Sequence, residues 1–302
     1  MDDIFYSQPP CYENQRSKIY QMKEQFRSAK IFVVGKSLCS RGIYGIGVGK
    51  LTNAVLYAGT FHATEWLTGL LLYKFAEDVL SAYFGSKDNY LGGINIKTSL
   101  DNRGIIIVPI INPDGVEILL NGAETAGRFK NIVLDASGGD LSRWNANARG
   151  VDINHNFDAG FSEIKKLERL QGIIRPSPRK WGGKTPHSEP ETVNMVRLCR
   201  SFDVSRVYAF HSQGEEIYWQ YGKHTPPQSL TMANVLGKTS GYTVTEPDLA
   251  ASHAGFKDWF IDKFHRPGFT IEIGRGENPL PIDDLKPIYA RLCEMLAVGL
   301  VI

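Results

Sequence analysis

The chain has 302 residues, of which 42% are hydrophobic, and this is enough for a sizeable core in one large domain or two modest ones. Its 34 basic and 32 acidic residues leave a formal net charge of only +2, so the protein offers no long-range field to a nucleic acid or an anionic membrane. We therefore expect no nucleic-acid partner and no membrane partner.

The start of the chain and its cysteines indicate a compartment. The first residues, MDDIFYSQPPCYENQ, carry acidic side chains where a signal peptide needs positive ones, and they lack an apolar core. No later stretch reaches the roughly 20 apolar residues that span a bilayer. The four cysteines lie far apart without a CxxC pair, which favours a reducing environment over a disulfide framework or a zinc ribbon. We expect a cytoplasmic protein.

Apolar, β-branched runs alternate with amphipathic stretches along the whole chain. Seven runs predict strands, at residues 30–37, 44–50, 53–60, 104–111, 205–212, 215–222 and 268–274. Three amphipathic stretches predict helices, at residues 64–84, 188–202 and 282–302. The second of these helices begins with a serine cap at Ser188 and an acidic first turn. Strands that alternate with helices predict an α/β fold on a mostly parallel sheet.

Two loops and three strand ends point to one face of this sheet. Residues 121–149 are the least regular region, and residues 175–188 form a second loop with Pro, Gly and Lys. Long loops in compact domains are more often functional than not, and we expect both to rim the same face. Ligands of open α/β sheets bind at the carboxyl ends of strands, where His62, His211 and Glu272 occur.

The residue types at these strand ends suit a metal ion. Catalytic zinc commonly takes two histidines and a carboxylate and leaves its fourth position for water. His62 and Glu65 share one turn, and His211 follows a distant strand. Taken alone, His62 is also explained as a strand-end histidine bonded to backbone, and an HxxE spacing often occurs by chance. Asp152 is placed to accept a hydrogen bond from the second nitrogen of His62, as the outer partner of a ligating imidazole does.

Five segments in the same order resemble the zinc carboxypeptidase family, the carboxypeptidase A-like metallopeptidases. The NPDG segment, which alone predicts only a type I or II turn, is one of them. The segments are the HxxE turn at His62–Glu65, the NPDG turn at Asn112–Gly115, the GVDxNxN stretch at Gly150–Asn156, the His-Ser step at His211–Ser212, and the strand FTIEIG with Glu272. The resemblance runs from about residue 31 to the C-terminus.

The resemblance implies a fold. The expected fold is α/β, with a mixed, mostly parallel eight-stranded twisted sheet flanked by helices and with zinc at the strand ends. All five segments then belong to one zinc peptidase domain over residues 1–302, and residues 1–30 form an N-terminal extension packed on it.

Roles follow where individual residues agree with the family. His62, Glu65 and His211 fall on the ligands of one Zn²⁺ per chain. Asp152 falls on the carboxylate that orients the first ligand, and Glu272 falls on the catalytic glutamate. Zinc would lower the pKa of its bound water to about 7 and polarise the scissile carbonyl, while Glu272 takes the proton of the water and passes it to the leaving amine.

Two of these roles have alternatives. Glu272 is also explained as a strand-end carboxylate paired with Arg275. The family's oxyanion-stabilising arginine follows a tryptophan, but Asn145 stands at that place here. Arg143 and Arg149 lie nearby, and we assign the role to Arg143 because a cation near the developing oxyanion stabilises it.

The residues expected to bind the substrate depart from the common family pattern. Asn154 matches an asparagine that holds the substrate carboxylate, but His155 stands where typical members carry a clamping arginine. A second family arginine is Thr64 here. Ordinary removal of C-terminal residues is therefore not expected.

Lys257 occupies a position that lines the specificity pocket of digestive carboxypeptidases. A lysine there is expected to bind an acidic group on the substrate. The alternative interpretation is a solvated helix lysine near Asp258 and Asp262. Tyr221 and Tyr242 both compete for the role of the family's substrate-capping tyrosine.

Together these features resemble the bacterial branch that cleaves γ-D-glutamyl-meso-diaminopimelate bonds in cell-wall peptides, and a murein tripeptide or similar small peptide is the expected substrate. The alternatives are a metallocarboxypeptidase for ordinary C-terminal residues, a deacylase for small acyl-amino acids, and a catalytically silent peptide-binding relative. The sequence leaves the oligomeric state open.

Overall fold

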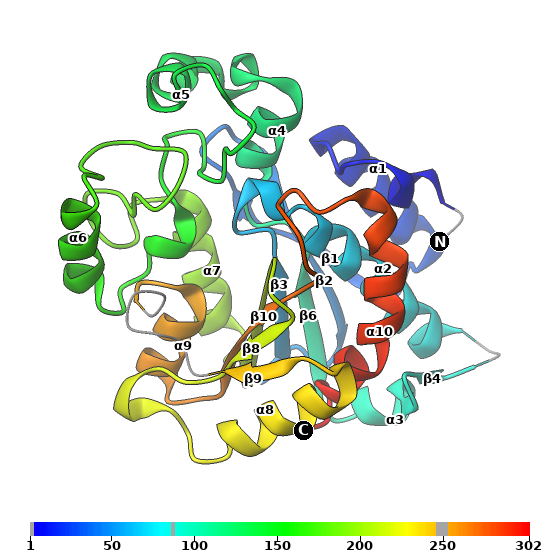
Figure 1. The fold of residues 1–302 in the computed structure, drawn as a ribbon. Helices are drawn as coiled ribbons and strands as arrows, with labels where there is room; N and C mark the ends of the chain where they lie inside the picture. The colour runs from blue at the N-terminus through cyan, green and yellow to red at the C-terminus, as the bar shows by residue number, and fades with distance from the viewer. Residues whose placement is uncertain (1–2, 86–87, 246–252) are drawn as a thin grey trace.

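The computed structural model describes residues 3–85, 88–245 and 253–302, and within them one sheet has eight strands in the order β1-β2-β6-β3-β7-β10-β8-β9 (Figure 1). The central strands β6, β3, β7 and β10 run parallel, whereas β2 and β8 join this block antiparallel. The strands are β1 Lys30–Lys36, β2 Gly42–Gly49, β3 Val55–Gly59, β6 Gly104–Val108, β7 Arg206–His211, β8 Glu216–Tyr218, β9 Thr243–Thr245 and β10 Gly268–Glu272. The predicted mixed, mostly parallel eight-stranded sheet is confirmed.

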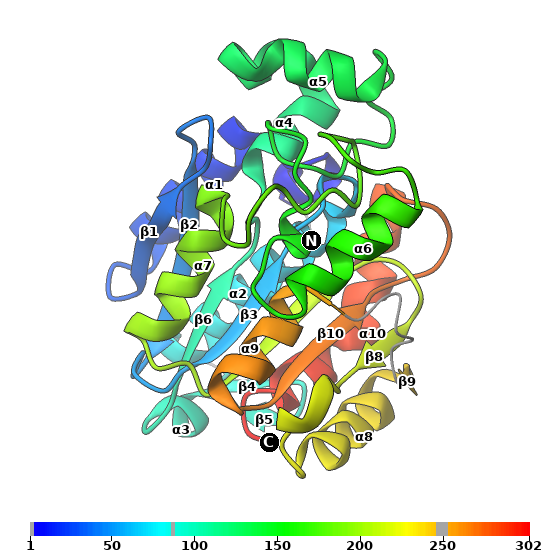
Figure 2. The ribbon, with the colours of Figure 1, turned by 90° about the vertical axis from the view of Figure 1, so that its left-hand side faces the viewer.

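Side chains alternate across the two faces of this sheet, as the two-residue period of a strand requires. Ile105 and Ile107 of β6 belong to one core cluster, and Ile106 and Val108 belong to another. The first cluster lies under α2 (Leu67–Phe84), α8 (Ser229–Ser240) and α10 (Leu285–Val298). The second lies under α7 (Pro190–Ser201) and α9 (Phe256–Phe264), on the opposite face (Figure 2). Burial on both faces explains why the central strands are apolar throughout.

The remaining described elements lie around these layers. Residues 3–30 contain α1 (Tyr12–Gln25), whose Ile19 and Met22 are buried in the first cluster, and Lys18 forms ion pairs with Asp3 and with Glu77 of α2. None of the described helices has the length and apolarity needed to cross a bilayer. The other elements are β4 Tyr90–Leu91, β5 Ile94–Asn95, α3 Ile96–Leu100, α4 Pro113–Asn121, α5 Lys130–Ser137 and α6 Phe161–Leu170.

Three helices were predicted, and one predicted cap is wrong. The helix at residues 188–202 begins at Pro190, and its N-cap is Glu189, whose side chain makes no capping hydrogen bond. Proline is favoured in the first turn because it has no N–H to satisfy, and here it fixes the start. Ser188 instead donates its hydroxyl to the Glu189 carboxylate.

The prediction that residues 121–149 are irregular is wrong for their first half. A 3-10 helix at Ala123–Phe129 and α5 occupy residues 123–137, and their few apolar side chains pack with the buried Trp144. The NPDG turn is the first turn of α4, in which the Asn112 side chain caps the helix by accepting from Gly115 N at 2.9 Å. Because residues 123–137 carry no continuous apolar stripe, their sequence pattern gave no helical signal.

Candidate active site

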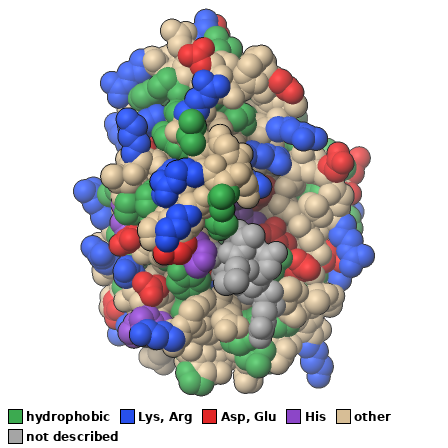
Figure 3. Space-filling view, turned by 60° about the vertical axis from the view of Figure 1, so that its left-hand side comes forward, with side chains coloured by type: hydrophobic (Ala, Val, Ile, Leu, Met, Phe, Trp, Pro, Cys, Tyr) green, Lys and Arg blue, Asp and Glu red, His purple; other side chains and the backbone are tan. Residues whose placement is uncertain are grey.

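The carboxyl ends of β3, β7 and β10 open into a pocket of about 570 Å³. Both loops that were expected to rim this face contribute to its lining, the first through Arg143 and Asn145 and the second through Arg179. The start of α9 forms another wall through Lys257 and Asp258. The space-filling view shows Lys, Arg, Asp, Glu and His side chains around the hollow (Figure 3).

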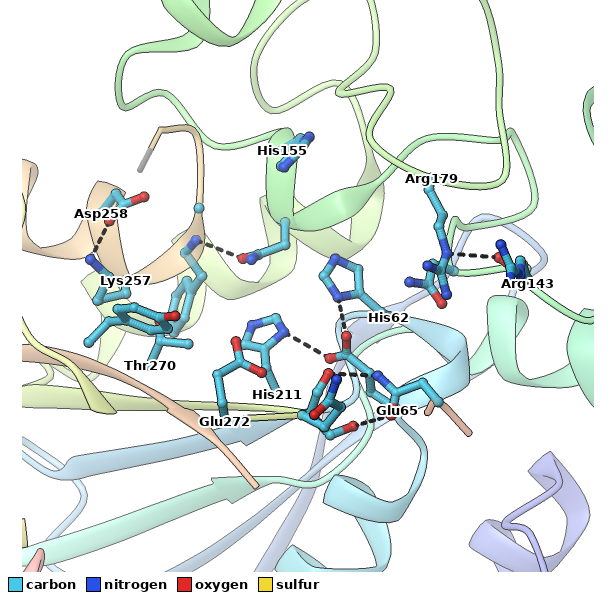
Figure 4. A pocket seen from close by; sticks show the side chains of 18 of the residues that line it. His62, Glu65, Arg143, His155, Arg179, His211, Lys257, Asp258, Thr270 and Glu272 are labelled. Carbon is cyan, nitrogen blue, oxygen red and sulfur yellow. Dashed lines mark hydrogen bonds and ion pairs between the residues drawn. The ribbon is translucent and has the colours of Figure 1, made fainter. Parts of the chain in front are cut away.

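Among the described residues, one group of metal-binding side chains lies at the floor of this pocket. His62, Glu65 and His211 offer ligand atoms that all lie within 4.8 Å of one another. His62 Nδ1 is 2.8 Å from Glu65 Oε1, and His211 Nδ1 is 2.9 Å from Glu65 Oε2 (Figure 4). The structure therefore brings together the three side chains that the sequence predicted as zinc ligands.

The hydrogen bonds around His62 show why this group suits a cation. Its Nε2 lies 3.0 Å from Asp152 Oδ1, so Nε2 carries a proton and donates it to that carboxylate. A neutral His62 then turns the lone pair of Nδ1 toward a Glu65 oxygen, which is also an acceptor. Two facing acceptors need a positive charge between them, which a divalent metal or a second proton on His62 supplies. Asp152 has the orienting position that the sequence predicted, since its other oxygen accepts from Lys180 N at 2.9 Å.

The pKa values at this group follow from its charges. Burial raises the pKa of Glu65, but the charges of His62 and His211 outweigh burial and bring it down to about 2. Burial lowers the pKa of His62, but Glu65 and Asp152 outweigh it and raise the value well above its usual range. Burial also raises the pKa of Asp152, yet His62 holds it well below its usual range. The site thus keeps its carboxylates ionised and attracts positive charge.

Glu272 ends β10 and lies beside His211 at the edge of the metal-binding group. Burial, followed by the charge of Glu65, raises the pKa of Glu272 well above its usual range. A cation at the three ligands acts in the opposite direction and favours the ionised carboxylate that a general base needs. Arg275 pairs with Glu215 at 2.8 Å, so the alternative pairing of Arg275 with Glu272 is not what the structure contains.

Asn154 and His155 both line the pocket from a short 3-10 turn at Ile153–His155. Asn154 Oδ1 accepts from Phe256 N at 3.0 Å, which turns the amide nitrogen of the same side chain toward the cavity side of α9. His155 Nδ1 donates to Lys180 O at 2.8 Å. Because Nδ1 is used in this way, Nε2 is the nitrogen of His155 that can bind a ligand.

Lys257 is buried, and this corrects one of its two interpretations. Its side chain is only 7% exposed, so it is not a solvated helix lysine. It lines the pocket as predicted, but it is paired with Asp258 at 2.5 Å and donates to Gln220 O at 2.7 Å. The predicted cation of the pocket is therefore one half of an ion pair.

The structure also contains pocket residues that sequence reasoning missed. Arg179 lies next to Arg143, and its Nε donates to the Arg143 carbonyl at 3.3 Å. Both guanidinium groups line the pocket, whereas Arg149, the other nearby arginine, lies 3.3 Å from a carboxylate oxygen of Glu189. Asn145, at the place of the family's arginine, accepts from the hydroxyl of Thr64.

Neither tyrosine proposed as a substrate cap is part of the pocket lining. Tyr242 is 4% exposed, and its hydroxyl accepts from Gly274 N at 3.2 Å. The Tyr221 hydroxyl lies 3.3 Å from His253 Nδ1. Tyr218 of β8 is the tyrosine that the described pocket contains, with its hydroxyl donating to Glu216 at 2.6 Å.

A His-Glu-His group at the strand ends of a mixed eight-stranded sheet, with a carboxylate beside it, defines a zinc-dependent peptidase. The profile of zinc carboxypeptidases matches residues 16–295, and the chain belongs to this family. It is a zinc metallopeptidase, and the predicted cofactor, one zinc ion, is confirmed by the family and by the fit of the His-Glu-His group.

Comparison with known proteins identifies relatives in sequence and in fold. "Gamma-D-glutamyl-L-diamino acid endopeptidase 1" of Lysinibacillus sphaericus is 36% identical over 270 residues, which cover 88% of this chain but only 66% of that protein. Bovine thrombin-activatable fibrinolysis inhibitor, solved with a tick carboxypeptidase inhibitor, superposes with a TM-score of 0.72 at 19% identity over 98% of this chain and 97% of that one. The murein-tripeptide amidase of Escherichia coli O157 gives a TM-score of 0.52 at 16% identity over 88% and 91%.

Proposed function

We propose that this protein cleaves the γ-D-glutamyl-meso-diaminopimelate amide bond of small cell-wall peptides. The Lysinibacillus relative, whose name describes a γ-D-glutamyl-L-diamino acid endopeptidase, supports this substrate class at 36% identity. The murein-tripeptide amidase supports the fold alone. A cytoplasmic location would suit the recycling of such peptides and stays a prediction.

The observation that carries the proposal is the distribution of charge on the two sides of the metal-binding group. Arg143 and Arg179 lie on one side of His62, and Lys257 lies beyond His211 on the other (Figure 4). A D-glutamate linked through its γ-carboxyl keeps a free α-carboxylate next to the scissile bond, and diaminopimelate adds carboxylates on the amine side. The two arginines suit the free α-carboxylate of D-glutamate, and Lys257, paired with Asp258, places charged groups on the side of diaminopimelate.

The residues of the site then take distinct roles in hydrolysis. When bound at His62, Glu65 and His211, zinc supplies a Lewis acid for the scissile carbonyl and lowers the pKa of water. Asp152 holds the His62 ring in the orientation that the ligand needs. Glu272 accepts the proton of the attacking water and delivers it to the leaving nitrogen.

Groups at the wall of the pocket bind and orient the peptide. Asn154 and His155 hold the carboxylate of the residue on the amine side, and Arg143 lies on the side where negative charge develops on the carbonyl oxygen. His155 forms a single-point contact, unlike the two-point grip of an arginine, and this separates the protein from ordinary carboxypeptidases.

The test compares two substrates on the zinc-loaded protein. One is L-alanyl-γ-D-glutamyl-meso-diaminopimelate, and the other is a blocked dipeptide with an α-linked C-terminal glutamate. We expect kcat/KM to be at least about a hundredfold higher for the tripeptide, since two charged contacts separate the substrates. Equal rates, or a preference for the blocked dipeptide, would assign the protein to the ordinary carboxypeptidases instead.

A further inference from the structure

We infer that the buried pair Lys257–Asp258 is a receptor for a zwitterion, and that it binds the distal ammonium and carboxylate of a diamino-dicarboxylic residue together. This inference rests on the proposed function for the identity of the peptide. It adds Asp258 as a second specificity-determining residue. In this view Lys257 does not select a lone carboxylate but a group that carries both an ammonium and a carboxylate.

The pair is buried at the wall of the pocket. Lys257 and Asp258 both line the cavity, and their side chains are only 7% and 4% exposed. Both lie in the first turn of α9, and Lys257 is 6.0 Å from the centre of the Tyr221 ring. Removing two charges from water has a large cost that the ion pair itself only partly offsets. By contrast, Lys263 and Asp262 on the same helix are 42% and 30% exposed.

Both partners keep capacity for a ligand. An ammonium has three N–H donors, and within the described residues Lys257 donates one of them to Gln220 O while it forms an ion pair with Asp258 Oδ1. A carboxylate accepts about four hydrogen bonds, and the ion pair occupies one oxygen. The other oxygen, Oδ2, lies beside the backbone of Gly255, where even a methyl group would come within 3.0 Å of it.

The Asn154 amide lies on the same side. A methyl group on Gly255 would be 3.7 Å from Asn154 Nδ2, so Gly255 separates the Asp258 carboxylate from the residue that holds the terminal carboxylate. A substrate residue whose own carboxylate is bound at Asn154 therefore sends its side chain toward the pair.

The charge of the pair decides which side chains it accepts. Because Lys257 and Asp258 neutralise each other, a lone carboxylate gains an attraction to Lys257 and meets repulsion from Asp258, and a lone ammonium meets the reverse. A group that carries both charges places each beside its opposite, and four charges then alternate in sign. Of the side chains in cell-wall peptides considered above, that of diaminopimelate ends in such a group, with an ammonium and a carboxylate on one carbon.

A series of peptides that differ in one residue tests the inference. The common part is L-alanyl-γ-D-glutamate, and the last residue is meso-diaminopimelate, L-lysine with the ammonium alone, L-2-aminopimelate with the carboxylate alone, or L-norleucine with neither. Each peptide is measured with the wild type, Lys257→Met and Asp258→Asn. Lys263→Met and Asp262→Asn, outside the pocket lining, are the matched controls on the same helix.

The expected result is an exchange of preference. The wild type should favour diaminopimelate over both singly charged peptides by about ten- to hundredfold in kcat/KM. Asp258→Asn leaves an unopposed cation, so aminopimelate should become the better of the two singly charged peptides. Lys257→Met leaves an unopposed anion, so the lysine peptide should become the better of the two singly charged peptides. The controls should keep the wild-type order.

Other outcomes overturn the inference. Equal losses on all four peptides in both variants, with zinc content retained, would mean that the pair only stabilises α9. If the wild type prefers the aminopimelate peptide over the diaminopimelate peptide, then Lys257 selects a carboxylate alone and the inference is wrong.

A second measurement separates this inference from the proposed function. The dissociation constants of free meso-diaminopimelate, lysine and 2-aminopimelate are determined by calorimetry, which requires no turnover. Should the γ-D-glutamyl peptides not be cleaved while free diaminopimelate still binds at least about tenfold more tightly than the other two, the proposed function fails and the zwitterion receptor stands. Equal affinity for all three amino acids overturns the receptor, whatever the peptidase cleaves.

Discussion

Glu272 lies beside His211 because the last residue of β10 pairs in parallel register with the last residue of β7. A proton acceptor and a metal ligand are thus fixed on adjacent strands of a buried sheet, where their relative position depends on backbone hydrogen bonds. Sites on regular elements hold their geometry better than sites on loops, and catalysis needs that accuracy.

Removal of one ligand should abolish the metal site. His211→Ala leaves His62 and Glu65 as a two-ligand site, so zinc should be lost on dialysis and hydrolysis should fall to background. Zinc per chain is measured by atomic absorption together with activity. His224→Ala serves as the control, because His224 lies outside the pocket lining. Full zinc occupancy in His211→Ala would remove this histidine from the ligand set.

The general base should be separable from the metal site. Glu272→Gln preserves shape and hydrogen bonding but cannot accept a proton, so kcat should fall about 10²- to 10⁴-fold while zinc content and substrate affinity persist. Single-turnover rates and substrate dissociation constants check this. A variant with more than about a tenth of the wild-type rate would mean that another group accepts the proton.

Arg179 should bind the free carboxylate on the acyl side of the substrate. Arg179→Ala should lower kcat/KM about three- to thirtyfold for a peptide with a free D-glutamate α-carboxylate, a modest loss because this side chain is exposed to screening solvent. The corresponding D-isoglutamine peptide, which lacks that charge, should lose little. Arg175→Ala in the same loop is the control, since Arg175 is exposed outside the pocket lining. An equal loss on both peptides would contradict the assignment.

A buried carboxyl group away from the active site should make stability depend on pH. Burial, followed by the charge of Asp114, raises the pKa of Glu191 from 4.5 to about 8. The folded protein therefore holds a proton that the unfolded chain releases, and the free energy of unfolding should fall as pH rises from 4.5 to about 8. The slope from this group is at most about 1.4 kcal/mol per pH unit.

Glu191→Gln isolates that contribution. The uncharged amide has no proton to lose, so the variant should show a weaker fall in stability between pH 5 and pH 8 (roughly the window between the two pKa values). Urea unfolding at several pH values gives the comparison. Identical pH profiles for the two proteins would show that Glu191 is already ionised in the folded state.

Most of the metal centre could be predicted from the sequence because its residues follow buried strands in short motifs. His62 and Glu65 share a turn, and the parallel sheet brings His211 to the same edge. The apolar runs that define β3, β7 and β10 give a strong periodic signal, so their ends are well located. Asp152 was placed from the GVDxNxN stretch at Gly150–Asn156, because it follows no predicted strand.

The substrate pocket could not be predicted to the same extent. Arg179 comes from a loop without periodicity, and the pairing of Lys257 with Asp258 depends on how α9 packs against the segment at Gln220. Strand β9 has only three residues, which is too short for an alternating pattern. The contacts of Arg179 with Arg143 and of Lys257 with Gln220 join distant segments, which local sequence patterns do not record.

The separation of the site residues along the chain affects when activity can begin. His211 and Glu65 are 146 residues apart, and the pocket also takes residues from as late as Asn278. A growing polypeptide on the ribosome therefore has no complete pocket until nearly all of this domain has left the exit tunnel and the strands have joined. The topology of the sheet therefore withholds hydrolysis from partial chains.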